Sequence, residues 1–177
     1  MNPRPPQRWL ALLAFVCSLG CEPVPTVPVP PVQCDKLAEY VDDTSPDAVT
    51  LPISVTNGLG SYFEARTLCV TVDGKRLGAR MPAEQGAALR GRQPVELRAG
   101  LQPGISHRVR VLAVYVGTGA FSAYTFAVGS EREIAPSELS ATPLEVAVVE
   151  VAPSTRTPLE QRPQVRWSGP GHTVIRH

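Results

Sequence analysis

The sequence has no apolar run long enough to hold a helix across a membrane. Its longest such run, Leu10 to Leu19, spans ten residues, whereas a membrane-spanning helix needs about 20. Aromatic residues make up 6% of the chain and the formal net charge is +1, so no strong field attracts nucleic acid or anionic lipid. None of the four cysteines is separated from another by the two residues typical of zinc sites. We therefore expect no metal site.

Motifs for catalysis are also scarce. The chain has three histidines and no Gly-x-Ser-x-Gly elbow. Gly117-Thr118-Gly119 lacks the third glycine of a dinucleotide loop and precedes a predicted strand, which favours a hairpin turn over a phosphate site. His107 opens another predicted strand, and we expect a surface position for it rather than the role of a base. The sequence thus predicts neither an enzyme nor a bound cofactor.

The apolar run closes with Ser18-Leu19-Gly20-Cys21. Arg4 and Arg8 precede the run without any acidic residue, so residues 1–20 have the layout of a secretory signal peptide. The closing stretch resembles the lipobox of bacterial lipoproteins, which implies cleavage before Cys21 and acylation of its thiol. Its first two residues depart from the usual aliphatic and small pair. The alternative is a secreted protein in which this cysteine is incidental.

The residue after the cysteine bears on the membrane. Glu22 is not the aspartate that marks inner-membrane retention in many enteric bacteria, so the resemblance favours a lipid anchor in the outer membrane. Prolines then alternate through residues 22–32. A proline-rich chain extends by about 3.1 Å per residue, so these eleven residues would hold the domain roughly 30 Å from its anchor. Residues 21–33 are therefore predicted to be the lipidated cysteine and a proline-rich stalk.

Cysteine placement predicts one disulfide. Cys17 would leave with the leader and Cys21 would carry lipid. Cys34 and Cys69 remain, and exported proteins fold in an oxidising compartment. We therefore expect these two residues to be joined, on the face of the sheet opposite Leu68.

Residues 34–151 are predicted to form one domain of short strands. Val49 to Thr56 alternates between apolar and polar residues, and Pro52 suggests that this strand lies at a sheet edge. Asp73-Gly74 predicts a hairpin turn. The remaining segments are strands at 66–72, 75–80, 95–97, 106–116, 121–128 and 144–151, and a helix at 82–90. About seven short strands predict an all-β, immunoglobulin-like β-sandwich. Residues 152–177 read as a flexible tail.

Two resemblances extend this prediction. Val70 to Gly74, together with Pro103-Gly104 before His107 to Val111, resembles small immunoglobulin-like modules of bacterial surface proteins. A longer segment, 109–167, resembles a family of uncharacterised exported proteins from gliding soil bacteria. That resemblance is carried by Ala113-Val114-Tyr115, by Phe121 to Tyr124 and by Thr157 to Pro163. No activity is established for the family, so it implies no catalytic residues.

Charged clusters are predicted to face solvent. Asp42, Asp43 and Asp47 lack the spacing of a calcium loop and indicate a polar turn. Acidic residues at 131, 133 and 138 are predicted to lie in a loop. The arginines at 90, 92, 98, 108 and 110 would form a basic patch, but stacking aromatics do not alternate with them, so no nucleic-acid partner is expected.

The hairpin from Ser106 to Val128 gives the clearest sign of a partner. If Thr118-Gly119 is the turn, Val116 pairs with Phe121 and Val114 with Ala123. Both faces of the hairpin are then apolar, although the outer face of a sandwich sheet is usually polar. Two kinds of cover remain open. One is internal, by Val165 and Trp167 folding back or by a neighbouring loop, and the other is a partner bound at Val114, Val116 and Phe121.

These patterns together predict a lipid-anchored, non-enzymatic interaction module of the bacterial cell envelope. It would serve as a subunit or accessory of machinery for secretion, motility or surface polymers. The alternative is a carbohydrate- or peptidoglycan-binding lipoprotein, which requires a groove with exposed aromatics and paired acids. A hydrolase is the third reading, and no catalytic residue supports it.

Overall fold

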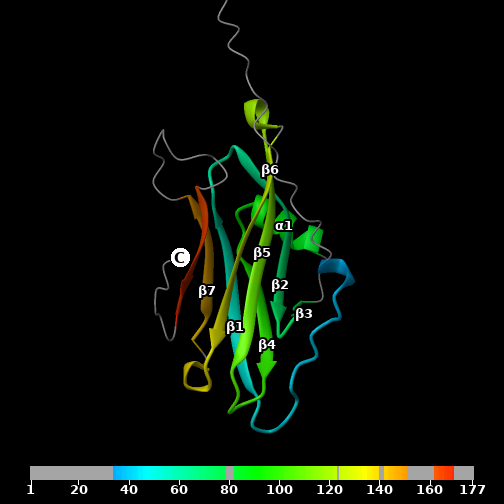
Figure 1. Ribbon diagram of the computed structural model, residues 1–177, viewed down its shortest axis with the longest axis vertical. Helices are drawn as coiled ribbons and strands as arrows, with labels where there is room; N and C mark the ends of the chain where they lie inside the picture. The colour runs from blue at the N-terminus through cyan, green and yellow to red at the C-terminus, as the bar shows by residue number, and fades with distance from the viewer. Residues whose placement is uncertain (1–33, 79–81, 123, 140–141, 151–161, 170–177) are drawn as a thin grey trace, which may run out of the picture.

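The computed structural model describes residues 34–78, 82–122, 124–139, 142–150 and 162–169 (Figure 1). The predicted leader, Cys21 and the stalk lie outside the described residues. Within the described residues, no helix has both the length and the apolar character needed to span a membrane.

Eight described strands form two four-stranded sheets, with the orders β4-β1-β7-β8 and β3-β2-β5-β6. The expected all-β sandwich is confirmed, with eight strands where about seven were predicted, and the immunoglobulin-like layout stays a prediction. The strands are β1 (Val49–Gly58), β2 (Phe63–Val72), β3 (Lys75–Arg76), β4 (Val95–Leu101), β5 (His107–Gly117), β6 (Thr125–Ile134), β7 (Leu144–Glu150) and β8 (Pro163–Ser168). The helices are η1 (Cys34–Lys36), α1 (Pro82–Arg90), η2 (Gly119–Phe121) and η3 (Pro136–Glu138).

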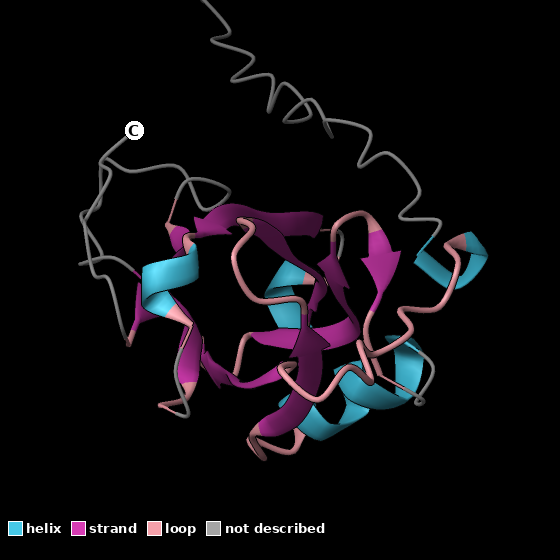
Figure 2. Ribbon diagram, turned by 90° about the horizontal axis from the view of Figure 1, so that it is seen from below, coloured by secondary structure: helices cyan, strands magenta, loops and turns pink. Residues whose placement is uncertain are grey.

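The core is formed by side chains from both sheets, and Figure 2 shows the sheets end-on. Side chains alternate along a strand, and every second residue is buried throughout β5 and from Leu51 to Val55 in β1. The inner residues are Leu51, Ile53 and Val55 from β1, and Val109, Val111, Ala113 and Tyr115 from β5. Tyr115 is 0% exposed and stacks on Phe126 with ring centroids 5.5 Å apart.

β1 is a central strand, so the prediction that Pro52 marks an edge is wrong. It pairs antiparallel with β4 from Val49 to Val55 and parallel with β7 from Ile53 onward. Pro52 therefore precedes the stretch that has strands on both sides. At Pro52, β1 has a paired strand on the β4 side only, so the local pairing is that of an edge, where proline is tolerated.

The predicted hairpin turn and helix both form. Asp73 and Gly74 have φ values of 51° and 78°, which suits the Asp-Gly turn between β2 and the very short β3. Helix α1 covers the predicted residues 82–90 and buries Leu89. It packs so tightly on β2 that a Cβ at Gly86 would overlap the backbone of Arg66, which explains glycine within this helix.

Part of the predicted tail is a strand. Residues 163–168 form β8, where Val165 pairs with Val148 and Trp167 with Val146. The Trp167 Nε1–H donates a hydrogen bond to Ser130 Oγ on β6 at 2.8 Å. This closes the side of the sandwich between β6 and β8, so the prediction of a flexible tail is wrong for these residues. Residues 152–161 and 170–177 lie outside the described part.

The β5–β6 hairpin has a different register from the predicted one. Val116 pairs with Thr125 and Val114 with Ala127, because the connection contains η2 and is longer than a two-residue turn. The shift is four residues, an even number, so each β6 side chain keeps its predicted face. The acidic residues 131 and 133 lie on β6 rather than in a loop, and residue 138 lies in η3.

Candidate interaction surface

The outward residues of β2, β5 and β6, here called the outer face, form cross-strand rows. At one end the rows are charged, and at the other end they are mainly apolar. The charged rows are Asp73, Arg108 and Glu133, then Thr71, Arg110 and Glu131. The apolar end contains Cys69, Leu112 and Gly129, then Thr67, Val114 and Ala127, then Glu64, Val116 and Thr125. One sheet face therefore combines two kinds of surface.

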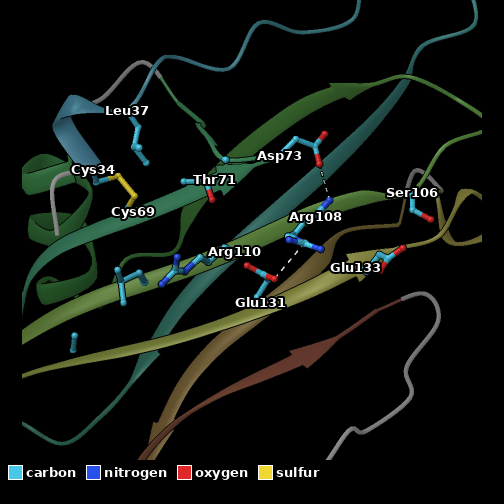
Figure 3. A pocket seen from close by; sticks show the side chains of 13 residues that line it. Cys34, Leu37, Cys69, Thr71, Asp73, Ser106, Arg108, Arg110, Glu131 and Glu133 are labelled. Carbon is cyan, nitrogen blue, oxygen red and sulfur yellow. Dashed lines mark hydrogen bonds and ion pairs between the residues drawn. A yellow bond between two sulfur atoms is a disulfide. The ribbon is translucent and has the colours of Figure 1, made fainter. Parts of the chain in front are cut away.

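A groove of about 900 Å3 runs across the outer face (Figure 3). The disulfide between Cys34 and Cys69 borders it, with a Cα–Cα distance of 6.0 Å. This pairing was predicted, as was the position of Cys69 opposite Leu68. The groove also contains Leu37, Thr71, Asp73, Gly74, Ser106, Arg108, Arg110, Leu112, Ala127, Glu131 and Glu133. Covalent attachment of η1 thus covers the β2 side of the face and leaves the β5–β6 side open.

Small residues on β6 keep the apolar strip of β5 accessible. Leu112, Val114 and Val116 are each only partly buried. Their β6 neighbours are Gly129, Ala127 and Thr125, all exposed. A Cβ at residue 129 would lie 2.9 Å from Leu112 Cδ1, so the glycine makes room for that side chain. Because the β6 side chains are smaller than their β5 neighbours, a partner can reach the strip from the β6 side.

The structure brings together two of the three predicted partner-binding residues. Val114 and Val116 lie on the outer face, as expected. Phe121 belongs to η2, before β6 begins, and its side chain lies outside the described part, as does Ala123. The alternative cover by Val165 and Trp167 is wrong, because both side chains pack against the core.

Charge on the outer face is only partly paired. Arg108 Nε lies 3.3 Å from Glu131 Oε1, and both side chains are well exposed, at 65% and 47%. Arg110 and Glu133 line the same groove, and neither forms an ion pair with another described residue. The predicted basic patch does not form, since Arg98 lies on β4 of the opposite sheet.

His107 is buried, so its predicted surface position is wrong. The residue is 3% exposed. Nδ1 lies 2.8 Å from Asp73 Oδ2 and Nε2 lies 2.9 Å from the Gln102 carbonyl oxygen. Both nitrogens are engaged, which leaves His107 unsuited to act as a base in the groove and makes it a cross-link between two turns.

Asp73 receives a second hydrogen bond, from the backbone N–H of Arg108 at 2.8 Å. Partial burial acts to raise the pKa of Asp73. Hydrogen bonds from Arg108 and His107, with the charges of His107 and Lys75, outweigh that effect and hold the pKa below its ordinary value. Sequence reasoning placed Asp73 in its turn and missed this link, because His107 is 34 residues away.

The predicted polar turn has specific hydrogen bonds. Asp42 Oδ1 accepts the Gly100 N–H at 2.7 Å, and Asp43 Oδ1 accepts the Ser45 N–H at 2.9 Å. The Tyr40 hydroxyl donates to the Gly100 carbonyl oxygen at 2.8 Å. The two bonds to Gly100 attach the segment before β1 to β4, and the bond between Ser45 and Asp43 lies within the turn. In the described part of the chain, no group of three or more histidine, cysteine or acidic residues is placed to hold a metal ion.

Comparisons with known proteins add no family. No protein-family model matches the chain, and neither a curated protein nor a solved structure matches it.

Proposed function

We propose that this protein is a lipid-anchored, non-enzymatic interaction module of the bacterial cell envelope, a subunit or accessory of a larger assembly. The anchor is proposed from the ending of the leader, Ser18-Leu19-Gly20-Cys21, which resembles a lipobox. Several acyl chains hold a protein stably on a membrane, because each buried methylene contributes about 0.8 kcal/mol. The outer membrane is the proposed location, from Glu22 after the cysteine.

The observation that carries the interaction role is the half-exposed apolar strip of Leu112, Val114 and Val116 on the outer face. Exposed apolar patches that are rimmed by polar groups mark protein contacts. Arg108, Arg110 and Glu131 provide such a rim at one end. Burial of this strip against a partner would stabilise the complex by about 25 cal/mol for each Å2 of apolar area removed from water.

A protein partner is favoured over a carbohydrate. Glu131 and Glu133 do supply paired acids. However, none of the described residues that line the groove is aromatic, so a sugar ring would have no stacking platform there. A protein segment with apolar side chains needs no such platform.

The anchor is tested by Cys21→Ala in cells that carry radioactive palmitate. We expect the variant to lose the label and to move from the membrane pellet to the soluble fraction. The matched control is Cys17→Ala, which alters the leader and leaves the proposed acylation site. Palmitate labelling that persists in the Cys21→Ala variant would exclude this anchor.

The interaction role is tested by a photo-crosslinking amino acid at position 116 in living cells. We expect a discrete crosslinked species, identified by mass spectrometry as an envelope protein. The control is the same amino acid at Thr50, an exposed position of β1 on the other sheet. Equal crosslinking from both positions would contradict a specific surface on β5.

A further inference from the structure

β6 is an edge strand with two unlike halves. Among the described strands it pairs with β5 alone. Its second half is guarded by charge: Arg132 forms an ion pair of 3.1 Å with Glu138, and Glu131 and Glu133 flank it. Its first half, Thr125 to Gly129, contains no charged residue and no proline. Proteins usually block free strand edges with charges or prolines, so an unblocked edge half is suited to strand pairing.

The unblocked half adjoins the apolar strip of the outer face. A strand added beyond β6 would lie two strand spacings, or roughly 10 Å, from β5. Between them lie only Thr125, Ala127 and Gly129 on the outward side. Because these residues are small, bulky outward side chains of an added strand would reach over them to Val114 and its apolar neighbours.

We propose that Thr125 to Gly129 of β6 accepts an extended strand of a partner protein by β-strand addition. The partner strand carries bulky apolar side chains at alternate, outward positions. It continues beside the second half of β6 with Lys or Arg on the same side. Backbone hydrogen bonds supply affinity, and the alternate side chains supply specificity. This inference rests on the proposed interaction role and names the segment and the kind of partner.

Charge complementarity supports a basic continuation. Glu133 faces outward on β6 and lines the groove without an ion pair among the described residues. Opposite charges across neighbouring strands stabilise the pair. A basic residue of the partner would supply the missing cation beside Glu133.

A second copy of this chain fits the surface less well. If β6 of another copy were added, its outward residues would again be Thr125, Ala127 and Gly129. These side chains are too short to cover Val114 from two strands away. The shape of the outer face therefore favours a different protein with large side chains.

The test uses the full chain in mild detergent and two fluorescent peptides, Val-Thr-Phe-Thr-Val-Thr-Lys-Thr-Lys and the same residues in reverse order. The two orders cover parallel and antiparallel addition. We expect fluorescence anisotropy to show saturable binding of one peptide. Ala127→Lys places a charge on the open half of the edge and should weaken binding by about tenfold or more. Gln164→Lys, at an exposed position of β8, is the control and should bind like the wild type.

A charge exchange tests the basic continuation. Glu133→Lys should weaken binding of the Lys peptide by about two- to fivefold, and a peptide with Glu in place of Lys should recover it. Circular dichroism and melting temperature, unchanged in Ala127→Lys, show that the variant is folded.

Three results would overturn the inference: no binding of either peptide, equal binding by wild type and Ala127→Lys, or self-association that Ala127→Lys abolishes without peptide binding. Failure here leaves intact the anchor and crosslinking tests at Cys21 and Val116, which decide the proposed function separately.

Discussion

The outer faces of the two sheets differ although their inner faces are alike. On β1 the outward residues are Thr50, Pro52, Ser54 and Thr56, and the Ser54 hydroxyl donates to Glu96 Oε1 at 2.6 Å. On β5 the outward residues change along the strand from Arg108 and Arg110 to Leu112, Val114 and Val116. Both strands bury a run of at least three apolar side chains on the inner side. The core therefore does not require the apolar strip of β5.

That difference separates stability from recognition. A half-buried valine on an outer face contributes less to folding than a fully buried one, because less of its area leaves water. It contributes more when a second molecule covers it. The β1 face is therefore suited to water, and the β5 face to contact with another molecule.

The largest effect is expected in the core that both sheets share. Tyr115→Ala should lower the free energy of unfolding by about 3–5 kcal/mol, since a large buried aromatic ring is removed. Tyr115→Phe keeps the ring and loses only the hydroxyl bond to Asn57 Oδ1, at 3.2 Å, so it should cost about 1 kcal/mol. Urea denaturation measures both. A small effect of Tyr115→Ala would contradict the view that the inner side chains of β5 stabilise the fold while the outer ones serve recognition.

Removal of the disulfide, which borders one side of the outer face, is expected to have the next largest effect on stability. Cys34 and Cys69 are separated by 35 positions, and in the chain-entropy model a loop of this length contributes roughly 4 kcal/mol, often less in measurements. The double variant Cys34→Ser and Cys69→Ser should unfold at a correspondingly lower urea concentration. Mass spectrometry without reduction should find the two wild-type peptides linked, and two free thiols in the exported protein would contradict the assignment.

Acid should lower the stability of the folded protein by protonating Asp73 at the charged end of the outer face. Its pKa is lowered in the folded protein, so its stabilising effect is complete above the ordinary value of 3.8. That contribution decreases as the pH falls through the ordinary value and then the lowered one. Asparagine, like aspartate, tolerates the positive φ of this turn but has no carboxylate. Asp73→Asn should therefore remove this part of the acid dependence. Melting temperatures of the two proteins from pH 6 to pH 2 provide the measurement, and parallel curves would contradict the role.

The smallest effect on stability is expected from exchanging residue types between the two outer faces. Val114→Thr and Ser54→Val should each change the free energy of unfolding by less than about 1 kcal/mol, because both positions are only partly buried. Only Val114→Thr should reduce crosslinking from position 116. Equal reductions by both variants would show that the two outer faces do not differ in recognition.

Local sequence was sufficient for most strands, for the Asp73-Gly74 turn, for α1 and for the cysteine pair. These features depend on alternation, turn chemistry and compartment, which neighbouring residues reveal. The central position of β1 was not predictable, because it depends on parallel pairing with β7, about 90 residues away. Alternation in residues 163–168 was a usable signal for β8 that the surrounding prolines and arginines obscured.

For the candidate surface, the sequence located Val114 and Val116 on an apolar outer side. It misplaced their β6 partners by four residues. The glycines at 117 and 119 indicate a turn but do not reveal that the connection contains η2 and is longer than two residues. The buried link between His107 and Asp73 was missed, because a histidine at the start of a strand gives no sign of a carboxylate from another turn.

The position of the disulfide also has a mechanical consequence. If the N-terminal end of the domain is tethered, a pulling force reaches Cys34 and passes through the sulfur atoms directly to Cys69 in β2. Residues 35–68, which include β1, are excluded from the path of the load while the bond is intact. Single-molecule pulling from the N-terminus should therefore release the length of this segment only after a reducing agent is added.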